Sequence, residues 1–282
     1  MRTRGDLGPV LKWAGGKRQL LPHILARFPR PIPTYFEPFI GGGAVFFALA
    51  AEQAFERAVI ADRNPELVNV YRALQRDVEG VIRRLEEYAS AHSEEQYYLV
   101  RAAKPRALAA RAARFIYLNK TGFNGLYRVN RQGQFNVPLG RYKKPSIVDG
   151  ARLRAAARVL ADVEILESDF EAVCGRARKG DAVYLDPPYL PVSRTAHFAE
   201  YHAEPFGLEE HRRLAKAFAK LEARGVCALL SNSDTSDTRA LFGRFRLDQV
   251  AARRSINSNS RLRGPVAEIL VSTRAVMSPP EA

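Results

Sequence analysis

The stretch TYFEPFIGGGAVFFAL, residues 34–49, decides the fold class of this chain. Its first residues are aromatic and β-rich, three consecutive glycines follow at 41–43, and an apolar run that suits a helix closes it. This order predicts a strand, a tight turn and a helix. Glycine allows such a turn because it lets the backbone bend sharply, and it also lets a ligand approach the backbone closely. The stretch therefore predicts the opening unit of an α/β fold with a ligand at the glycine turn.

Strands and helices alternate through most of the rest of the chain. A second short strand is expected at 58–61, ending in Asp62, and helices are expected at 149–161 and 208–223. Further strands are expected at 163–166, 182–185, 226–231, 245–252 and 266–273. Strands that alternate with helices predict a mostly parallel, doubly wound α/β sheet.

Residues 65–145 break this alternation. Helical patterns fill 65–119, and the segment that follows is rich in Gly, Asn, Arg and aromatic residues, with hairpin signals at Asn124–Gly125 and Gln132–Gly133. We therefore predict two domains. The catalytic domain is formed by residues 1–64 and 146–282, and an inserted, mainly helical domain that carries a β-hairpin is formed by residues 65–145.

The net charge favours a polyanionic partner. Lysine and arginine number 44 against 30 aspartate and glutamate residues, for a formal charge of +14 at pH 7. Such a balance suits nucleic acid, through phosphate contacts and counterion release. An arginine-rich proteome explains the same excess, as in RALAARAAR at 106–114, so charge alone leaves both readings open.

The composition also bears on location and on metals. No apolar run approaches the roughly 18 residues of a membrane span, and the first residues lack the apolar stretch of a signal peptide, so we expect a cytoplasmic protein. Cys174 and Cys227 show no metal-ligand spacing, and the five histidines include no paired-ligand motif. We therefore expect neither a structural disulfide nor a catalytic metal.

An acid at the end of the second strand adds a cofactor signal to the glycine turn. Asp62 lies 21 residues after Gly41, a spacing that suits a carboxylate accepting hydrogen bonds from ribose hydroxyls. Phe46 occupies the place of the third glycine of a dinucleotide motif, and a bulky ring there argues against a pyrophosphate. A nucleoside cofactor without phosphate, such as S-adenosylmethionine, fits better than NAD.

Two further segments offer cofactor contacts. In LKWAGGKRQL, residues 11–20, we expect Trp13 to lie against the cofactor and Lys17 to pair with its methionine carboxylate. A plain surface turn before a helix explains the same segment. Asp169, after the strand at 163–166, suits either an adenine amino group or the N-cap of a helix. The residues alone leave these alternatives open.

The segment DAVYLDPPYL, residues 181–190, predicts the catalytic centre. Its apolar strand stops at Asp186, because Pro187 and Pro188 end strand pairing and fix their own φ angles. A carboxylate and the ring of Tyr189 are thus held at the carboxyl end of a strand, where open α/β sheets bind ligands. The Asp186 side chain and the Pro187 carbonyl can accept hydrogen bonds from the amino group of a nucleobase, and Tyr189 can stack on that base. Since the base must leave its duplex, we expect base flipping and direct methyl transfer.

Several motifs in one order resemble the Dam-type DNA adenine-N6 methyltransferases of the D12 class. They are LKWAGGK at 11–17, FEPFIGGGAVFF at 36–47, IADRN at 60–64, LNKTGFNGLYRVNRQGQFNVPLGRYKKP at 118–145, LDPPY at 185–189 and RRSINSN at 253–259. The resemblance covers nearly the whole chain. It implies a Rossmann-like S-adenosylmethionine-dependent methyltransferase sheet with an inserted target-recognition domain. It also implies methyl transfer from S-adenosylmethionine to N6 of adenine in double-stranded DNA, within GATC, by a monomer.

The resemblance and the residue patterns together give a set of expected site residues. The catalytic residues are Asp186, Pro187, Pro188 and Tyr189. The cofactor residues are Trp13, Lys17, Phe39, Gly41, Gly43, Asp62, Asp169 and Asp186. The DNA-binding residues, for recognition or intercalation, are Asn124, Leu126, Arg128, Asn136, Arg141 and Tyr142. For the two arginines, plain phosphate contact without base recognition is the alternative.

Two alternative functions share part of this pattern. Tetrads related to DPPY, residues 186–189, occur in RNA adenine and protein glutamine methyltransferases. Asp rather than Asn at position 186 and the match over 118–145 favour DNA. A DNA-binding module without activity would have a degraded tetrad or glycine turn, and both are intact. One departure from Dam proteins is the basic stretch SNSRLRG at 258–264, where those proteins often carry a shorter glycine-rich stretch. Neighbouring genes would distinguish an orphan enzyme from half of a restriction-modification pair.

Overall fold

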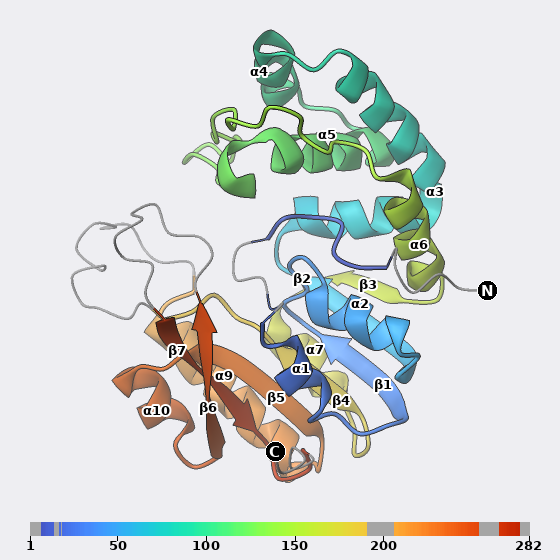
Figure 1. Ribbon diagram of the computed structural model, residues 1–282. Helices are drawn as coiled ribbons and strands as arrows, with labels where there is room; N and C mark the ends of the chain where they lie inside the picture. The colour runs from blue at the N-terminus through green and yellow to red at the C-terminus, as the bar shows by residue number, and fades with distance from the viewer. Residues whose placement is uncertain (1–6, 14–16, 18, 191–205, 254–264, 277–282) are drawn as a thin grey trace. The chain divides into compact units, whose positions relative to one another are not determined.

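The computed structural model describes residues 7–13, 17, 19–190, 206–253 and 265–276 (Figure 1). Within these residues seven strands form one sheet in the order β3-β2-β1-β4-β5-β7-β6. The strands are β1 (Ile32–Glu37), β2 (Phe55–Asp62), β3 (Glu164–Glu167), β4 (Ala182–Leu185), β5 (Cys227–Ser233), β6 (Arg246–Arg253) and β7 (Pro265–Ser272). The predicted α/β class with a Rossmann-like sheet is confirmed.

The order of the strands reverses between β1 and β4. From β1 the chain builds outward to β2 in one direction, whereas β4 pairs with the other side of β1, with Tyr35 opposite Ala182 and Phe36 opposite Val183. The three pairings that join β2, β1, β4 and β5 are all parallel. Such a reversal leaves a crevice outside the carboxyl ends of the two strands, which is where open α/β sheets bind ligands. A ligand site is therefore expected at the carboxyl ends of β1 and β4.

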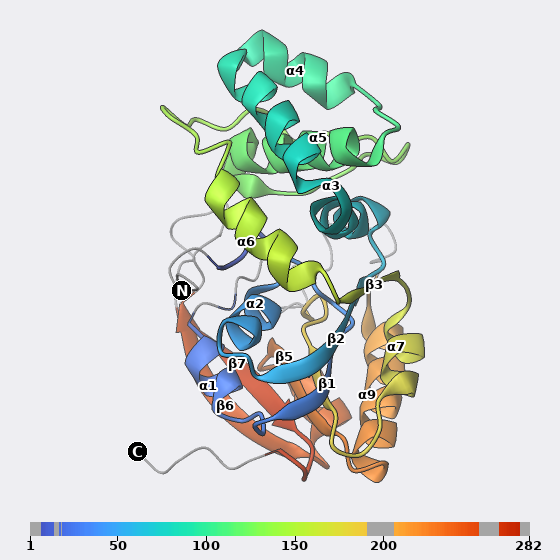
Figure 2. The same ribbon diagram turned by 90° about the vertical axis from the view of Figure 1, so that its right-hand side faces the viewer.

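The last two strands run against the rest of the sheet. β7 pairs antiparallel with both β5 and β6, and its start lies beside the end of β5, with Glu268 opposite Ser233. The Glu268 side chain consequently reaches the same edge of the sheet as the carboxyl end of β5. Helices α7 (Phe170–Arg176) and α9 (Leu208–Ala223) lie side by side along one face of these strands, and α1 (Leu21–Leu25) lies on the other face (Figure 2).

The contacts divide the chain into two compact units. One contains residues 1–16, 41–51 and 62–167, and the other contains residues 17–40, 52–61 and 168–282. The first unit holds the helices α2 (Ala44–Ala51), α3 (Pro65–Ser90), α4 (Glu94–Ala102), α5 (Leu108–Thr121) and α6 (Gly150–Leu160). The inserted domain at 65–145 and its boundaries stay a prediction.

Local chemistry accounts for the long helix that opens the first unit. Asn64 is the N-cap of α3, and its side chain accepts hydrogen bonds from the backbone N–H groups of Glu66 and Leu67. Pro65 occupies the first helical position, where a missing N–H group is harmless. One face of α3, including the fully buried Leu67, Tyr71 and Leu74, packs against α5 and α6. Burial of this face against two helices fixes the scaffold from which the segment 122–142 extends.

One of the two hairpin signals is correct and one is wrong. Gly133 donates to the carbonyl of Asn130, and an isolated antiparallel bridge joins Val129 to Phe135, so the second signal marks a short hairpin. Asn124–Gly125 instead belongs to a 3-10 turn, η1 (Phe123–Gly125), that continues directly from the end of α5. Both residues have a positive φ, 54° and 65°, which is the property that the hairpin signal detects. Helix α10 (Ser236–Phe242) was not predicted, and helices at α1 and α7 were expected only as alternatives for the segment 11–20 and for Asp169.

Candidate active site

The predicted acidic tetrad stands at the carboxyl end of β4. Nζ of Lys17 lies 2.9 Å from Oδ1 of Asp186, and the hydroxyl of Ser231 donates to the same oxygen at 3.0 Å. Ser231 comes from β5, directly after Leu230, which is the register partner of Leu185. The parallel pairing therefore carries the hydroxyl to the carboxylate. Both contacts fall on one oxygen, so the carboxylate is fixed in orientation.

Two opposing influences act on the charge of Asp186. Its side chain is only 22% exposed, and burial raises the pKa of this carboxyl above its ordinary value. The ammonium group of Lys17, itself 5% exposed, and the Ser231 hydroxyl act against burial and lower the pKa of Asp186. Burial is the larger influence. Ionisation of Asp186 therefore depends most on the Lys17 ammonium group.

The ring of Tyr189 is also held in place. Its hydroxyl donates to Oε2 of Glu268 at 2.9 Å, and Nζ of Lys17 lies 4.7 Å from its ring centroid. Burial and the nearby Asp186 carboxylate raise the pKa of Tyr189 well above its ordinary value, so the phenol stays neutral. A hydrogen bond at one end and a cation over the face leave the ring few orientations. The tetrad thus presents a fixed carboxylate and a fixed aromatic ring.

In the first unit, two hydrogen bonds to Gly41 hold the glycine turn, residues 41–43, in place. The Gly41 N–H donates to Oδ2 of Asp62 at 3.3 Å, and the Tyr71 hydroxyl donates to the Gly41 carbonyl at 2.8 Å. Gly41 has φ +46° and Gly43 has φ +71°, a region that side chains rarely adopt. A Cβ atom at Gly41 would also lie 2.8 Å from Cδ1 of Trp13. The predicted cofactor residues Trp13, Gly41, Gly43 and Asp62 are thus brought together.

Asp62 combines burial with unused acceptor capacity. Burial raises the pKa of its carboxyl, and hydrogen bonds from the backbone of Asn64 and Gly41 oppose this rise. A carboxylate has about four lone-pair sites, so the backbone bonds from Gly41, Asn64 and Arg63 still leave room for a hydroxyl donor. Phe46, in the first turn of α2, is completely buried and packs edge-on against Phe47.

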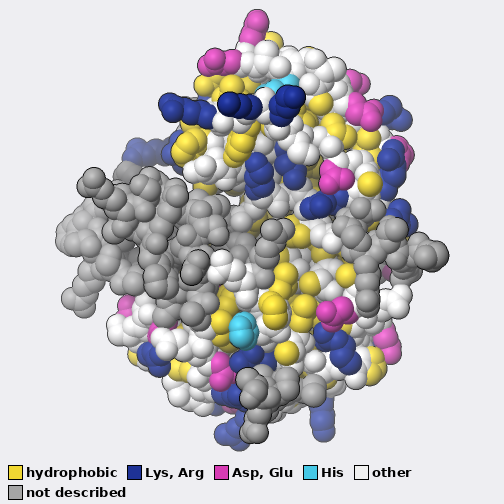
Figure 3. Space-filling view, in the orientation of Figure 1, with side chains coloured by type: hydrophobic (Ala, Val, Ile, Leu, Met, Phe, Trp, Pro, Cys, Tyr) yellow, Lys and Arg dark blue, Asp and Glu magenta, His cyan; other side chains and the backbone are white. Residues whose placement is uncertain are grey.

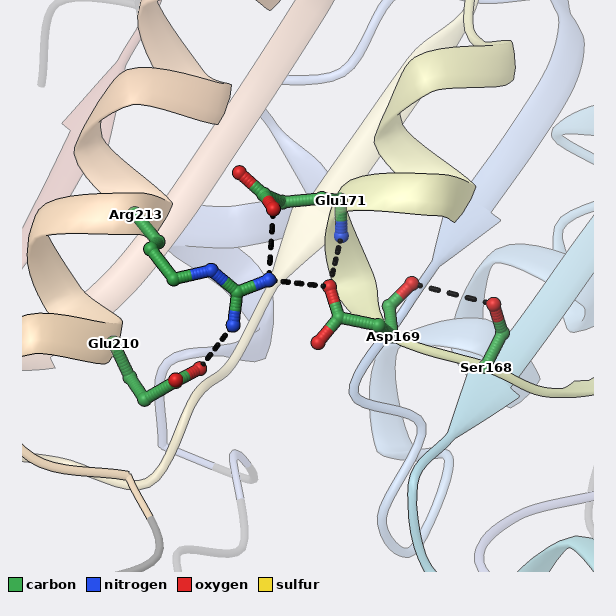
Figure 4. Close-up of polar contacts among 5 residues, drawn as sticks. All are labelled: Ser168, Asp169, Glu171, Glu210 and Arg213. Carbon is green, nitrogen blue, oxygen red and sulfur yellow. Dashed lines mark hydrogen bonds and ion pairs between the residues drawn. The ribbon is translucent and has the colours of Figure 1, made fainter.

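Asp169 is the N-cap of α7, so the simpler of the two interpretations of this residue is correct. Its Oδ1 accepts from the backbone N–H of Glu171 at 2.9 Å and from the guanidinium of Arg213 at 3.0 Å. Figure 4 shows Arg213 reaching from α9 to Asp169 and Glu171 at the start of α7, while its other nitrogen binds Glu210. The contact of Asp169 with a cofactor adenine stays a prediction.

Phe39 lies in an aromatic cluster of the second unit. Its ring stacks on Phe170 at 5.5 Å and meets the edge of Phe206 at 5.5 Å. Phe39 follows β1 and Phe170 opens α7, so the cluster stands next to the strand ends that flank the reversal of the sheet. Phe39 is half-buried, unlike its two partners, which are buried. An aromatic face of this kind suits a planar ring as its ligand.

The predicted DNA-binding residues lie on the surface of the first unit, where Figure 3 shows Lys and Arg side chains. Nε of Arg128 donates to Oδ1 of Asn136 across the short hairpin at 2.8 Å. Nζ of Lys12 lies 4.1 Å from the ring centroid of Tyr142, which is 37% exposed. Arg128, Arg141 and Asn124 are exposed, and Leu126 and Asn136 are half-buried. The departure at 258–264 lies outside the described residues.

Comparison with known proteins identifies the family. The profile of the D12 class N6 adenine-specific DNA methyltransferases matches residues 13–256. The chain belongs to this class. It is 41% identical over 279 residues to the Type II methyltransferase M1.LlaDCHI of Lactococcus lactis subsp. cremoris, covering 96% of this chain and 97% of the relative. It is also 39% identical to the Type II methyltransferase M.MjaIII of Methanocaldococcus jannaschii (94% and 99%) and 37% identical to the DNA adenine methylase of Escherichia coli K12 (95% and 96%).

Membership of the D12 class confirms the predicted enzyme, an adenine-specific DNA methyltransferase, and therefore its DNA substrate. Within the described residues no group of three or more His, Cys, Asp and Glu side chains is placed to hold a metal ion. No helix in that part of the chain is both long and apolar enough to cross a membrane. The roles of the individual residues stay predictions.

Four residues that hold predicted site residues in place, one in the first unit and three in the second, were not predicted from the sequence. Ser231 and Glu268 orient the tetrad, Tyr71 fastens the glycine turn, and Phe170 pairs with Phe39. Ser231 was detectable in principle, because it lies at the carboxyl end of a predicted strand. Glu268 was not, because its approach depends on the antiparallel register of β7.

We expect the Asp62→Ala variant to bind S-adenosylmethionine more weakly by about 1.5–3 kcal/mol, the range for hydrogen bonds to a charged group. The loss is expected because ribose hydroxyls lose their acceptor. Calorimetric titration measures it, with Tyr71→Phe as the matched control, since that change loosens the same glycine turn without touching the carboxylate. Equal losses in the two variants would assign the effect to the turn and not to the ribose.

Proposed function

We propose that this D12 methyltransferase transfers the methyl group of S-adenosylmethionine to N6 of adenine in double-stranded DNA, within GATC, after flipping the base out of the duplex. The observation that carries the proposal is the fixed carboxylate of Asp186 at the carboxyl end of β4, held by Lys17 and Ser231. The family supports DNA adenine as the acceptor. A DNA substrate also supports the expectation of a cytoplasmic enzyme.

The chemistry requires help at the amino group. The lone pair of the adenine N6 is delocalised into the ring, so the amino group is a poor nucleophile. Acceptors placed on its two N–H bonds, the Asp186 carboxylate and the Pro187 carbonyl, favour a more tetrahedral nitrogen whose lone pair is free to attack. In this transfer the N–C bond would form as the sulfur–methyl bond breaks, the electron pair of the broken bond would stay on sulfur as a neutral thioether, and one N6 proton would pass to water. Positioning and fixed acceptors suffice, without a covalent intermediate on the protein.

The residues present fit the cofactor. S-adenosylmethionine supplies an electrophilic methyl group on a positively charged sulfur. Asp62 offers a carboxylate with spare acceptor sites for ribose hydroxyls, and Phe39 offers an aromatic face for adenine. Phe46 stands where a dinucleotide-binding motif has its third glycine, and its bulk argues against a bound pyrophosphate. This agrees with S-adenosylmethionine, a nucleoside that carries no phosphate.

The partial burial of Asp186 and Tyr189 supports base flipping. Tyr189 is held by Glu268 and Lys17, and Asp186 is mostly buried, so neither side chain extends from the protein surface to an adenine stacked within a duplex. An adenine that has left the stack can lie on the face of Tyr189 with its amino group at Asp186. Enzymes that modify a base commonly flip it out of the stack at an unstacking cost of a few kcal/mol.

Arg128 and Arg141 are proposed to recognise bases of GATC. Arginine binds guanine through O6 and N7, and each good pair gives about 1–3 kcal/mol of discrimination. The bond to Asn136 fixes the plane of the Arg128 guanidinium, as such recognition needs. We therefore expect Arg128→Ala and Arg141→Ala each to relax preference at one base pair.

Methylation rates on duplexes altered at each position of GATC measure this preference. Arg131→Ala is the control, because Arg131 is exposed at the tip of the same hairpin. A phosphate contact would instead weaken all sequences alike and lower the salt slope by about 1. A uniform loss across the altered duplexes would make both arginines backbone anchors and remove them from base recognition.

The proposed activity is tested directly on duplex DNA. DNA that contains GATC sites is incubated with the protein and S-adenosylmethionine, then cut with endonucleases that distinguish methylated from unmethylated GATC. Protection at GATC alone supports the proposal, and methylation at another adenine site would correct the sequence specificity. RNA and protein offered in the same assay test the alternative of an RNA adenine or protein glutamine methyltransferase.

A further inference from the structure

We infer that Asn119 is a positioning residue that couples binding at the glycine turn to recognition of DNA by the segment 122–142. The inference rests on the proposed function, because it takes the cofactor to bind at the turn and DNA to bind at the segment. Every contact that carries it lies within the first compact unit.

Asn119 joins two pieces of backbone that are far apart in sequence. Its Oδ1 accepts from the N–H of Lys12 at 2.8 Å, and its Nδ2 donates to the Lys12 carbonyl at 2.7 Å and to the Gly125 carbonyl at 2.9 Å. The side chain is 3% exposed, so water cannot replace these bonds. A side-chain amide that bonds both the N–H and the carbonyl of one residue takes the place of a backbone partner, as in a pair of strands. Asn119 therefore fixes residue 12 against the η1 turn.

The fit between residue 12 and the η1 turn is close. A Cβ atom at Gly125 would lie 2.7 Å from Cβ of Lys12, and Gly125 has φ +65°. The ring of Tyr142, at the far end of the segment, lies under the Lys12 ammonium group at 4.1 Å. Backbone and side chain of residue 12 thus contact both ends of the recognition segment. A displacement of this residue cannot leave the segment unchanged.

The next residue carries the connection to the glycine turn. The ring of Trp13 lies next to both Phe115 and Tyr127, with centroids 6.3 Å and 6.2 Å away, and those two rings stack on each other at 5.2 Å. Its edge also lies against the turn, where a Cβ atom at Gly41 would be 2.8 Å and one at Gly42 would be 3.0 Å from Trp13 atoms. Tyr127 directly precedes Arg128. One rigid ring therefore touches the predicted cofactor turn and the recognition segment.

The segment also has room to respond. Phe115, Asn119, Leu126 and Tyr127 line a cavity of about 460 Å³ between α5 and the short hairpin. A shift of Trp13 that follows the cofactor would press on Tyr127, which borders this space and whose side chain also bonds Asn64. By linkage, a duplex that orders the segment must then favour the cofactor by the same factor.

The experiment measures that factor on the full chain. S-adenosylhomocysteine is the cofactor probe, because it cannot react, and a labelled GATC duplex is the DNA probe. Trp13 is the single tryptophan of the chain, so its fluorescence reports the junction directly. The affinity for S-adenosylhomocysteine is determined with and without saturating duplex, and the affinity for duplex with and without S-adenosylhomocysteine. For the wild type we expect the two ratios to agree, at about 5-fold or more.

Two matched variants separate coupling from stability. Asn119→Asp keeps the acceptor for the Lys12 N–H and removes both donors. Asn69→Asp is the control, because Asn69 is another buried asparagine of the same unit whose amide ties α3 to the start of α5, through the Leu108 carbonyl at 3.2 Å. We expect the ratio to fall to about 1 in Asn119→Asp and to stay at the wild-type value in Asn69→Asp.

Each other outcome overturns the inference. A ratio of 1 in the wild type itself, which needs no variant, shows that the two sites are independent. An unchanged ratio in Asn119→Asp, or an equal fall in both variants, removes the special role of Asn119. If the wild type binds neither probe, the proposed function fails first and the inference falls with it. If it binds both without coupling, the inference alone fails.

Discussion

Replacing Asp186 with alanine is expected to lower kcat for adenine methylation by at least about 10²–10³-fold, the loss seen when one preorganised group of a reaction centre is removed. The amino group loses the acceptor that favours its reactive geometry, and the site loses a negative charge close to a cationic cofactor. Binding of duplex DNA is expected to survive, because the exposed arginines of the recognition segment are untouched. Single-turnover methylation and anisotropy titration with a labelled duplex measure the two quantities.

Two further variants give this result its meaning. Asp186→Asn keeps one acceptor oxygen and removes the charge, so its rate should lie between those of the wild type and the alanine variant. Asp181→Asn changes another buried carboxylate, at the opposite end of β4, where it accepts from the Arg178 N–H at 2.8 Å. That control should keep its activity. Methylation close to the wild-type rate in Asp186→Ala would remove Asp186 from the reaction centre.

The sequence was sufficient to place the tetrad, because its position depends on local rules. The strand at 182–185 and the helix at 208–223 were predicted with the bounds that the structure shows. Short apolar runs, proline and charged residues set these ends through the chemistry of a few neighbouring residues. The alternation of strands and helices then predicted a doubly wound sheet, in which the carboxyl end of such a strand is a ligand site. None of these steps required a distant contact.

The groups that orient the tetrad depend on distant contacts and were missed. Glu268 reaches Tyr189 only because β7 runs antiparallel to β5 in one particular register, with Glu268 opposite Ser233. A slip of one residue would turn this side chain to the other face of the sheet. Nothing within the sequence around position 268 carries that information.

The error at Asn124–Gly125 has the same origin. The dipeptide has the positive φ angles that favour a two-residue hairpin. In the structure the Gly125 N–H donates to the Gly122 carbonyl, and the Gly125 carbonyl accepts from Asn119. These bonds continue the end of α5 as a 3-10 turn. A buried side chain on the preceding helix thus decides between two turns that the local residues allow equally.

The second large effect is expected from Lys17→Met. Methionine fills a similar volume without charge, so burial, which already raises the pKa of Asp186, is left without its main opponent. The pKa of Asp186 should therefore rise further. Because the carboxylate is the form that accepts from the amino group, activity is lost as pH falls through this pKa. The acid limb of kcat against pH is expected to move to higher pH. Removing one partner of a buried ion pair should also lower the free energy of unfolding by about 3–5 kcal/mol.

Lys17→Arg is the control, since it keeps a cation within reach of Asp186 and should leave the acid limb near its wild-type position. The same pH profiles decide between the two roles open to Lys17. If Lys17 serves mainly the methionine carboxylate of the cofactor, Lys17→Met raises KM for S-adenosylmethionine and leaves the acid limb of kcat in place. If it serves Asp186, to which it is bound at 2.9 Å, the limb moves and KM changes less. An unmoved limb would assign ionisation of Asp186 to Ser231 and its surroundings, and Lys17 to the cofactor.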